Sequence, residues 1–159
     1  MGQIQSMVAS MTAADWIERI ATVFETSSLH FGHGTDNARD EAAWLVLHAS
    51  GAPLDGSFTA WGRAVDARQA GAVQRLLKAR LETGKPLAYL TGSAWFAGLE
   101  FRSDPRAIIP RSPIAELILN EFQPWYSGPA PRRVLDLCCG GGCIGLAVAH
   151  YYPDVQVDL

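Results

Sequence analysis

A glycine-rich turn between an apolar strand and an apolar helix constrains the fold of this chain more than any other feature. Residues 134–138 have the composition of a buried strand, and three consecutive glycines follow at 140–142. Gly140, Gly142 and Gly145 match the dinucleotide-binding spacing, whose glycines permit a tight turn, close approach of the backbone to a ligand and dense helix packing. The sequence therefore predicts a strand, turn and helix of an α/β sheet that binds a nucleotide-type cofactor.

Asp136, which precedes the turn within the predicted strand, indicates which cofactor this is. A carboxylate at this position can accept hydrogen bonds from the amino-acid portion of a cofactor, which favours S-adenosylmethionine over a nicotinamide dinucleotide. The structural alternative is that Asp136 accepts hydrogen bonds from backbone amides of the turn. A phosphate-binding loop of the nucleotide-hydrolase type is excluded, because no Gly-Lys-Ser/Thr follows the glycines.

All three cysteines lie within the turn, at Cys138, Cys139 and Cys143. An odd number of thiols in so short a segment cannot form a disulfide framework, and it predicts a reducing, cytoplasmic location. Without a Cys-x-x-Cys pair the thiols would need a distant fourth ligand to hold a metal, so we expect no metal site and interpret them as small apolar filler. No apolar run approaches the length of a membrane span.

Residues 1–84 are predicted to form a small helical domain, because apolar residues recur there at helical spacing in three stretches. The first predicted helix spans residues 12–27, with Thr12 as its cap. The second is capped by Thr35 or Asp36 and ends at Gly51. The third begins at Val65 and ends at Gly84.

The pattern changes after this domain. Residues 85–109 contain apolar and aromatic pairs, Tyr89-Leu90 among them, separated by Gly92 and by Ala97-Gly98, which predicts a β-hairpin connector. A helix is then predicted from Pro113, with Ser112 as its cap, through Phe122.

Residues 110–159 are predicted to begin an open α/β domain, with the strand and turn described above, a helix over 144–150 and a second strand over 155–159. Only 24 residues run from Asp136 to Leu159. An open parallel sheet needs several more strands, so we expect this domain to be incomplete and its open strand edges to permit self-association.

Charge narrows the range of partners. The chain has 48% hydrophobic and 18% charged residues, the composition of a globular protein. Its net charge is −3, so it has no positive field that would attract nucleic-acid phosphates. We expect no direct nucleic-acid partner and no membrane partner, and a basic protein suits the mild acidity better.

Arg111 is a candidate for a substrate pocket. Pro110 and Pro113 restrict the backbone on both sides of this single charged side chain. The alternative is an ordinary solvated arginine.

Three segments together resemble one family, the protein-glutamine methyltransferases. They are residues 31–37 with 40–42, residues 86–91 with 94–96, and residues 109–114 with 116–117. The first and third segments are similar to the branch that modifies large-subunit ribosomal protein three, whereas the sister branch acts on peptide-chain release factors.

The resemblance implies a helical N-terminal domain that recognises the protein substrate, a hairpin connector and the start of a class I, Rossmann-like methyltransferase domain. It implies a ribosomal protein as substrate and S-adenosylmethionine as methyl donor. The positions that match the family's cofactor loop are Asp136, Leu137, Cys138, Cys139, Gly140 and Gly142. Cys138 stands where the family usually has glycine, and we expect its φ to be negative. The family's ribose carboxylate and its Asn-Pro-Pro-Tyr signature would follow Leu159, so we expect no catalytic residue in this chain and no turnover by it alone.

Three other functions remain open from the residues and motifs. The chain could modify release factors, it could be a non-catalytic module that docks a ribosomal protein, or it could belong to an NAD-dependent dehydrogenase, for which only the glycine spacing argues.

Overall fold

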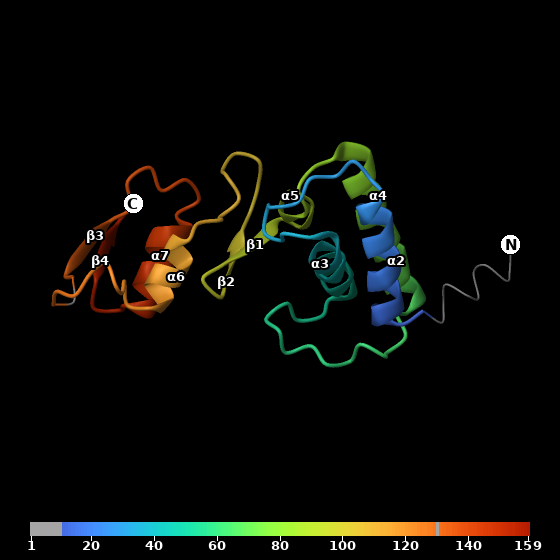
Figure 1. Ribbon diagram of the computed structural model, residues 1–159, viewed down its shortest axis with the longest axis horizontal. Helices are drawn as coiled ribbons and strands as arrows, with labels where there is room; N and C mark the ends of the chain where they lie inside the picture. The colour runs from blue at the N-terminus through green and yellow to red at the C-terminus, as the bar shows by residue number, and fades with distance from the viewer. Residues whose placement is uncertain (1–10, 130) are drawn as a thin grey trace, which may run out of the picture. The chain divides into compact units, whose positions relative to one another are not determined.

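The computed structural model describes residues 11–129 and 131–159, which fold as two compact units that meet in sequence at Thr91 and Gly92 (Figure 1). The first unit is helical, and the second combines helices with two small sheets. The chain is thus a mixed α/β protein with an N-terminal helical part, as the sequence predicts.

The helical unit contains α2 (Ala13–Glu25), α3 (Ala38–Ser50), α4 (Ala67–Thr83) and the short α5 (Leu87–Thr91). Helix α3 packs against both α2 and α4. Helix α5 corrects one prediction: Tyr89 and Leu90 were assigned to a strand, but they lie in one helical turn that follows Pro86. The fully buried side chains of this unit include Ile20, Phe24, Leu45, Val46, Val73 and Leu87.

Side-chain caps set the ends of these helices. Thr12 and Asp15 form a reciprocal capping box at the start of α2, as predicted, and Asp66 does the same with Gln69 for α4. The predicted cap of α3 is wrong. Asn37, rather than Thr35 or Asp36, caps α3, because its side-chain oxygen accepts the backbone N–H of Asp40 at 2.9 Å.

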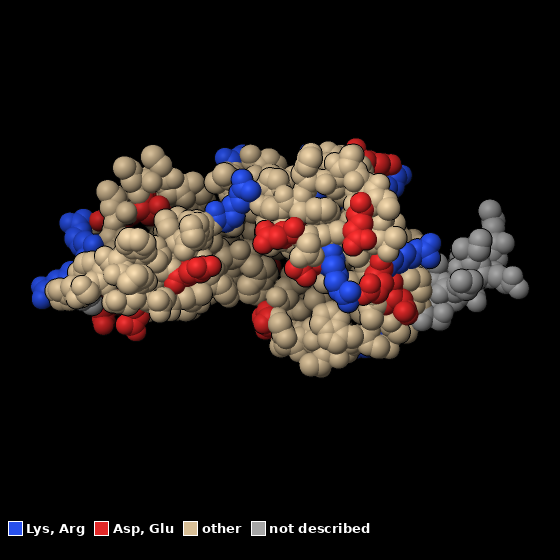
Figure 2. Space-filling model, in the orientation of Figure 1, with Lys and Arg blue, Asp and Glu red and all other residues tan. Residues whose placement is uncertain are grey.

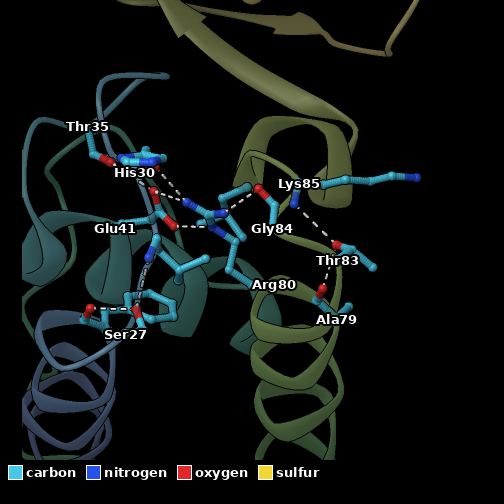
Figure 3. A network of polar contacts seen from close by, with 12 residues as sticks. Ser27, His30, Thr35, Glu41, Ala79, Arg80, Thr83, Gly84 and Lys85 are labelled. Atoms are coloured by element: carbon cyan, nitrogen blue, oxygen red, sulfur yellow. Dashed lines mark hydrogen bonds and ion pairs between the residues drawn. The ribbon is translucent and has the colours of Figure 1, made fainter.

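A buried ion pair joins α3, α4 and the segment between α2 and α3 (Figure 3). The side chains of Arg80 and Glu41 are 1% and 3% exposed, and Arg80 Nε donates to Glu41 Oε1 at 2.6 Å. The two terminal nitrogens of Arg80 donate to the carbonyl oxygens of Gly84 at 2.8 Å and His30 at 3.0 Å. Thr35 donates its hydroxyl to Glu41 Oε2 at 3.4 Å. One guanidinium therefore connects the end of α4 to two other parts of the unit.

The long loop between α3 and α4 is attached to the beginning of α2. The N–H groups of Ala13 and Ala14, which have no partner within the helix, donate to the carbonyl oxygens of Arg63 and Trp61, each at 3.1 Å. The N–H of Val65 donates to the carbonyl oxygen of Met11 at 2.9 Å. These bonds hold the loop around Trp61 beside α2.

The second unit begins with the predicted hairpin, whose antiparallel strands are β1 (Ser93–Phe96) and β2 (Leu99–Arg102). Phe96 pairs with Leu99, so the turn has two residues, Ala97 and Gly98, with φ of 49° and 75°. Two positive φ values are typical of the tight hairpin turns that match the twist of paired strands.

Helix α6 (Ile114–Leu119) is shorter than predicted, because Glu121 and Phe122 have φ of 52° and 60° and leave the helical conformation. The predicted cap, Ser112, is one residue off: Pro113 is the N-cap and the helix begins at Ile114, while the Ser112 hydroxyl accepts the N–H of Ile114 at 3.2 Å.

Strands β3 (Arg133–Leu135) and β4 (Gln156–Asp158) pair in parallel, with α7 (Cys143–Tyr151) between them in sequence. Both strands are shorter than predicted, whereas α7 extends one residue beyond the predicted helix at each end. Helix α7 packs on β4 and α6, and the Tyr151 hydroxyl donates to the carbonyl oxygen of Ala97 at 2.7 Å. The core of this unit comprises Phe96, Ala97, Ile118, Cys143, Ala147 and Val148.

Candidate functional site

The glycine-rich loop lies between the carboxyl end of β3 and the N-terminus of α7, as the sequence predicts. Gly142 is the N-cap of α7 with φ of 75°, and Gly140 has φ of 57°. A Cβ atom added to Gly140 would meet no atom within 4 Å. The turn therefore has open space beside its exposed backbone, and its glycines are required by conformation at these two positions.

Gly145 has a different role from the other two glycines. A Cβ atom at this position would collide with the side chain of Leu159 and lie 3.1 Å from Cγ1 of Val157. Gly145 thus allows α7 to pack closely on the segment around β4, which agrees with the packing role of the third glycine in the predicted spacing.

Asp136 connects the strand to the helix. Its N–H donates to the carbonyl oxygen of Asp158 at 2.9 Å, which continues the pairing beyond β3. Its carboxylate oxygen Oδ2 accepts the N–H of Gly145 at 2.9 Å. Gly145 is in the first turn of α7, where N–H groups lack partners within the helix, and the N-cap Gly142 has no side chain to supply one. Asp136 therefore caps α7 from outside the helix, which is the structural alternative raised by the sequence.

The three thiols differ in exposure. Cys138 is exposed, Cys139 is partly buried, and Cys143 is buried beneath the turn, where a Cβ at Gly141 would lie 3.6 Å from its sulfur. Burial, followed by the negative charge of Asp136, raises the pKa of the Cys143 thiol. The prediction that the thiols are apolar filler is confirmed for Cys143, which packs inside the unit, and is wrong for Cys138, which is exposed.

The prediction of a negative φ at Cys138 is wrong, since its φ is 62°. The ends of the turn are fixed on both sides, by the bond from Asp136 to Asp158 and by the bond from the Gly142 N–H to the Cys139 carbonyl oxygen at 2.8 Å. The chain between them adopts the left-handed conformation even though an L-residue there costs about 1–2 kcal/mol. Cys138 therefore takes the backbone conformation that suits a glycine.

Arg111 is exposed and lies between β2 and α6. The segment that leads to it passes beside the glycine turn, because a Cβ at Gly141 would lie 4.0 Å from Cβ of Ala107. Nothing in the sequence pattern indicates this proximity. The sequence places Leu137 inside a buried strand, and this is wrong: β3 ends at Leu135, and Leu137 lies at the start of the turn with 78% of its surface exposed.

The arrangement offers a ligand an exposed main-chain turn and the N-terminus of a nine-residue helix. The N–H groups of such a helix end attract negative charge and hydrogen-bond acceptors. In residues 11–129 and 131–159 no group of three or more His, Cys, Asp and Glu side chains is placed to hold a metal ion. No helix in the same residues has the length and apolar character needed to cross a membrane.

We compared the sequence with protein-family models and with curated proteins. Residues 25–92 match a family model described as the PrmC N-terminal domain. The chain is 50% identical over 148 residues to the ribosomal protein uL3 glutamine methyltransferase of Xylella fastidiosa strain Temecula1. The aligned region covers 92% of this chain and 47% of that protein. The chain is a relative of the protein-glutamine methyltransferases.

Two further relatives carry the same name, one from Xylella fastidiosa strain 9a5c and one from Xanthomonas campestris, each 49% identical over 148 residues. This confirms the family resemblance that the three sequence segments indicate. The chain spans about half the length of the curated relatives it matches. The match to the PrmC N-terminal domain ends at residue 92, one residue after the end of the helical unit at Thr91, and the region matched by the relatives continues through the glycine turn.

Proposed function

We propose that this protein, in its full-length form, transfers a methyl group from S-adenosylmethionine to the side-chain amide of a glutamine in ribosomal protein uL3. The observation that carries the proposal is the identity of 49–50% over 148 residues to proteins named for that reaction. The location is the cytoplasm, where this substrate is made. In this proposal residues 1–84 recognise the substrate, residues 85–109 connect, and residues 110–159 begin a class I, Rossmann-like methyltransferase domain, while the helical unit of the structure extends seven residues further, to Thr91.

The glycine turn fits S-adenosylmethionine. Gly140 has open space beside its Cα, Leu137 and Cys138 are exposed, and the buried thiol of Cys143 leaves that space clear. The residues that would hold the ligand are Asp136, Leu137, Cys138, Cys139, Gly140 and Gly142, with Arg111 at the substrate side. When bound, S-adenosylmethionine would supply a methyl group: its bond to the positively charged sulfur would break as the bond to nitrogen forms, S-adenosylhomocysteine would leave, and the amide nitrogen would lose one proton.

Alignment is the main contribution that the chain can make to this reaction. An amide nitrogen is a poor nucleophile, and holding reactants in line can supply on the order of 7–11 kcal/mol of barrier reduction. A turn with both ends hydrogen-bonded and a helix packed on β4 through Gly145 provides a rigid base for such alignment. Asp136 acts here by fixing α7 to the strand end.

The test is methylation of purified uL3 by the full-length gene product with S-adenosylmethionine, followed by peptide mass spectrometry. The expected result is one added methyl group on a glutamine side chain. The same assay is repeated with peptide-chain release factors as the substrate. Binding of NAD is measured by titration beside binding of S-adenosylmethionine. Methylation of release factors but not of uL3, binding of uL3 without methyl transfer, or saturable binding of NAD without S-adenosylmethionine would each contradict the proposal.

A further inference from the structure

A groove of about 320 Å³ lies between α2 and α3 of the helical unit. Ile17 and Ala43 contribute apolar surface from the two helices, and Trp61 contributes an aromatic ring from the long loop. Its charged side chains are Glu18, Arg39 and Asp40. We call this feature the α2–α3 groove.

Two contacts hold Trp61 in place. Its carbonyl oxygen accepts the N–H of Ala14 at 3.1 Å, and its ring packs edge-on against Phe58 with centroids 4.8 Å apart. Even so, 40% of Trp61 is exposed. A large aromatic ring held at the wall of a groove is a ready contact for a side chain of a partner, and it attracts cations placed over its face.

Acidic side chains predominate around the groove. Two acidic side chains, Glu18 and Asp40, line it against one basic side chain, Arg39. Figure 2 shows Asp and Glu side chains gathered over α2 and α3 with a Lys or Arg side chain among them. The groove therefore complements a positively charged group that also carries apolar surface, as the long side chains of lysine and arginine do.

One charged pair within the groove is exchangeable. Arg39 Nη2 lies 2.6 Å from Glu18 Oε1, and the two side chains are 67% and 59% exposed. Exposed pairs of this kind contribute about 0–1 kcal/mol, because water and salt screen them. Because the pair is weak, a cation from a partner can compete with Arg39 for Glu18 at little cost.

We infer that the α2–α3 groove docks a lysine- or arginine-bearing segment of the protein substrate. The inference rests on the proposed function, because a protein that is built into the ribosome binds RNA phosphates through basic residues. Trp61 packs on the apolar stem of the cation, while Glu18 and Asp40 face its charge.

The test measures binding of purified uL3 to the full-length gene product by isothermal titration calorimetry, together with KM and kcat for methylation. Glu18→Gln should weaken binding about fivefold, which is the upper range for an exposed charge pair. Trp61→Ala should weaken it about tenfold, as for an aromatic contact that also attracts a cation. Both should raise KM and leave kcat unchanged, since they affect only substrate binding. The loss in Glu18→Gln should shrink as salt is raised.

Arg39→Gln gives the sharpest outcome, because it should tighten binding by about fivefold as Glu18 loses its internal partner. Glu25→Gln is the matched control: it removes an equal charge from α2 outside the groove and should change the Kd less than twofold. Glu18→Gln replaces an exposed side chain, so it remains informative even if Trp61→Ala is unstable.

Normal methylation with unchanged Kd and KM in the Glu18, Trp61 and Arg39 variants would overturn the docking inference and leave the proposed function intact. Failure of the wild-type protein to bind and methylate uL3 would overturn both.

Discussion

Replacing Arg80 by methionine should strongly destabilise the helical unit. Methionine retains a flexible apolar side chain but removes every hydrogen bond that the guanidinium donates, to Glu41 and to the carbonyl oxygens of Gly84 and His30. Glu41, whose side chain is only 3% exposed, would then keep the 3.4 Å hydrogen bond from the Thr35 hydroxyl but would have lost its cation. A buried carboxylate without a cation is among the most unfavourable changes that a single substitution can produce.

The expected loss is about 3–5 kcal/mol in the free energy of unfolding, as for other buried pairs from which one partner is removed. Against a total stability of roughly 5–15 kcal/mol, this is a large fraction, and it corresponds to a fall in melting temperature of more than about 10 °C. The double variant Glu41→Met with Arg80→Met should lose less than Arg80→Met alone, because no charge remains buried. It should not regain full stability, since the carbonyl oxygens of Gly84 and His30 lose their donor.

The assay is urea unfolding followed by circular dichroism, with amide hydrogen exchange to localise the change to α3 and α4. Lys78→Met is the control, because Lys78 lies on the same helix and its pair with Glu82 is exposed, with nitrogen and oxygen 3.7 Å apart. That control should change stability by less than about 0.5 kcal/mol. A loss below about 1 kcal/mol in Arg80→Met, or a double variant less stable than the single one, would refute the reasoning.

Three further outcomes are expected in the turn and helix that follow β3. Cys138→Gly should stabilise the second unit by up to about 1 kcal/mol in thermal unfolding, because it removes the strain of a positive φ, and a lower melting temperature would contradict this. Gly145→Ala should destabilise by about 1–3 kcal/mol, because the added Cβ would lie 3.1 Å from Cγ1 of Val157 and 3.2 Å from Cβ of Asp136, whereas the matched change Gly71→Ala on α4, where the added Cβ meets only the end of an arginine side chain, should stabilise slightly. Iodoacetamide at about pH 8 should label Cys138 well before Cys143, since burial raises the pKa of the Cys143 thiol and keeps it protonated until the pH is higher. Peptide mass spectrometry that finds equal labelling of the two thiols would show that Cys143 is accessible.

Several of the structural features were predictable because they depend on neighbouring residues alone. Thr12 caps α2, and Gly51 and Gly84 end α3 and α4 with φ of 67° and 64°. The two-residue turn at Ala97 and Gly98 was indicated by its composition. Each of these depends on local backbone conformation and on hydrogen bonds within a few positions of the chain, so the residue types suffice.

Errors arose where two local solutions were nearly equal. Thr35, Asp36 and Asn37 are all good capping residues; in the structure Asn37 caps α3, while the Thr35 hydroxyl donates to Glu41, 6 positions away. Residues 87–91 have an apolar composition that fits a strand or a buried helical turn, and the structure forms the helical turn, with Leu87 and Ala88 buried.

The sequence by itself determined the helical N-terminal part, the hairpin, the strand and glycine turn before α7, and the family resemblance, because these follow from periodicity and from short motifs. Arg80 even falls on the apolar face of α4, seven positions after Val73. Only the tertiary structure decided that Arg80 meets Glu41, 39 positions away, that Asp136 caps α7 at Gly145, and that Trp61 closes a groove between two helices. Contacts of this kind depend on how whole elements pack, and no local pattern of residues encodes that geometry.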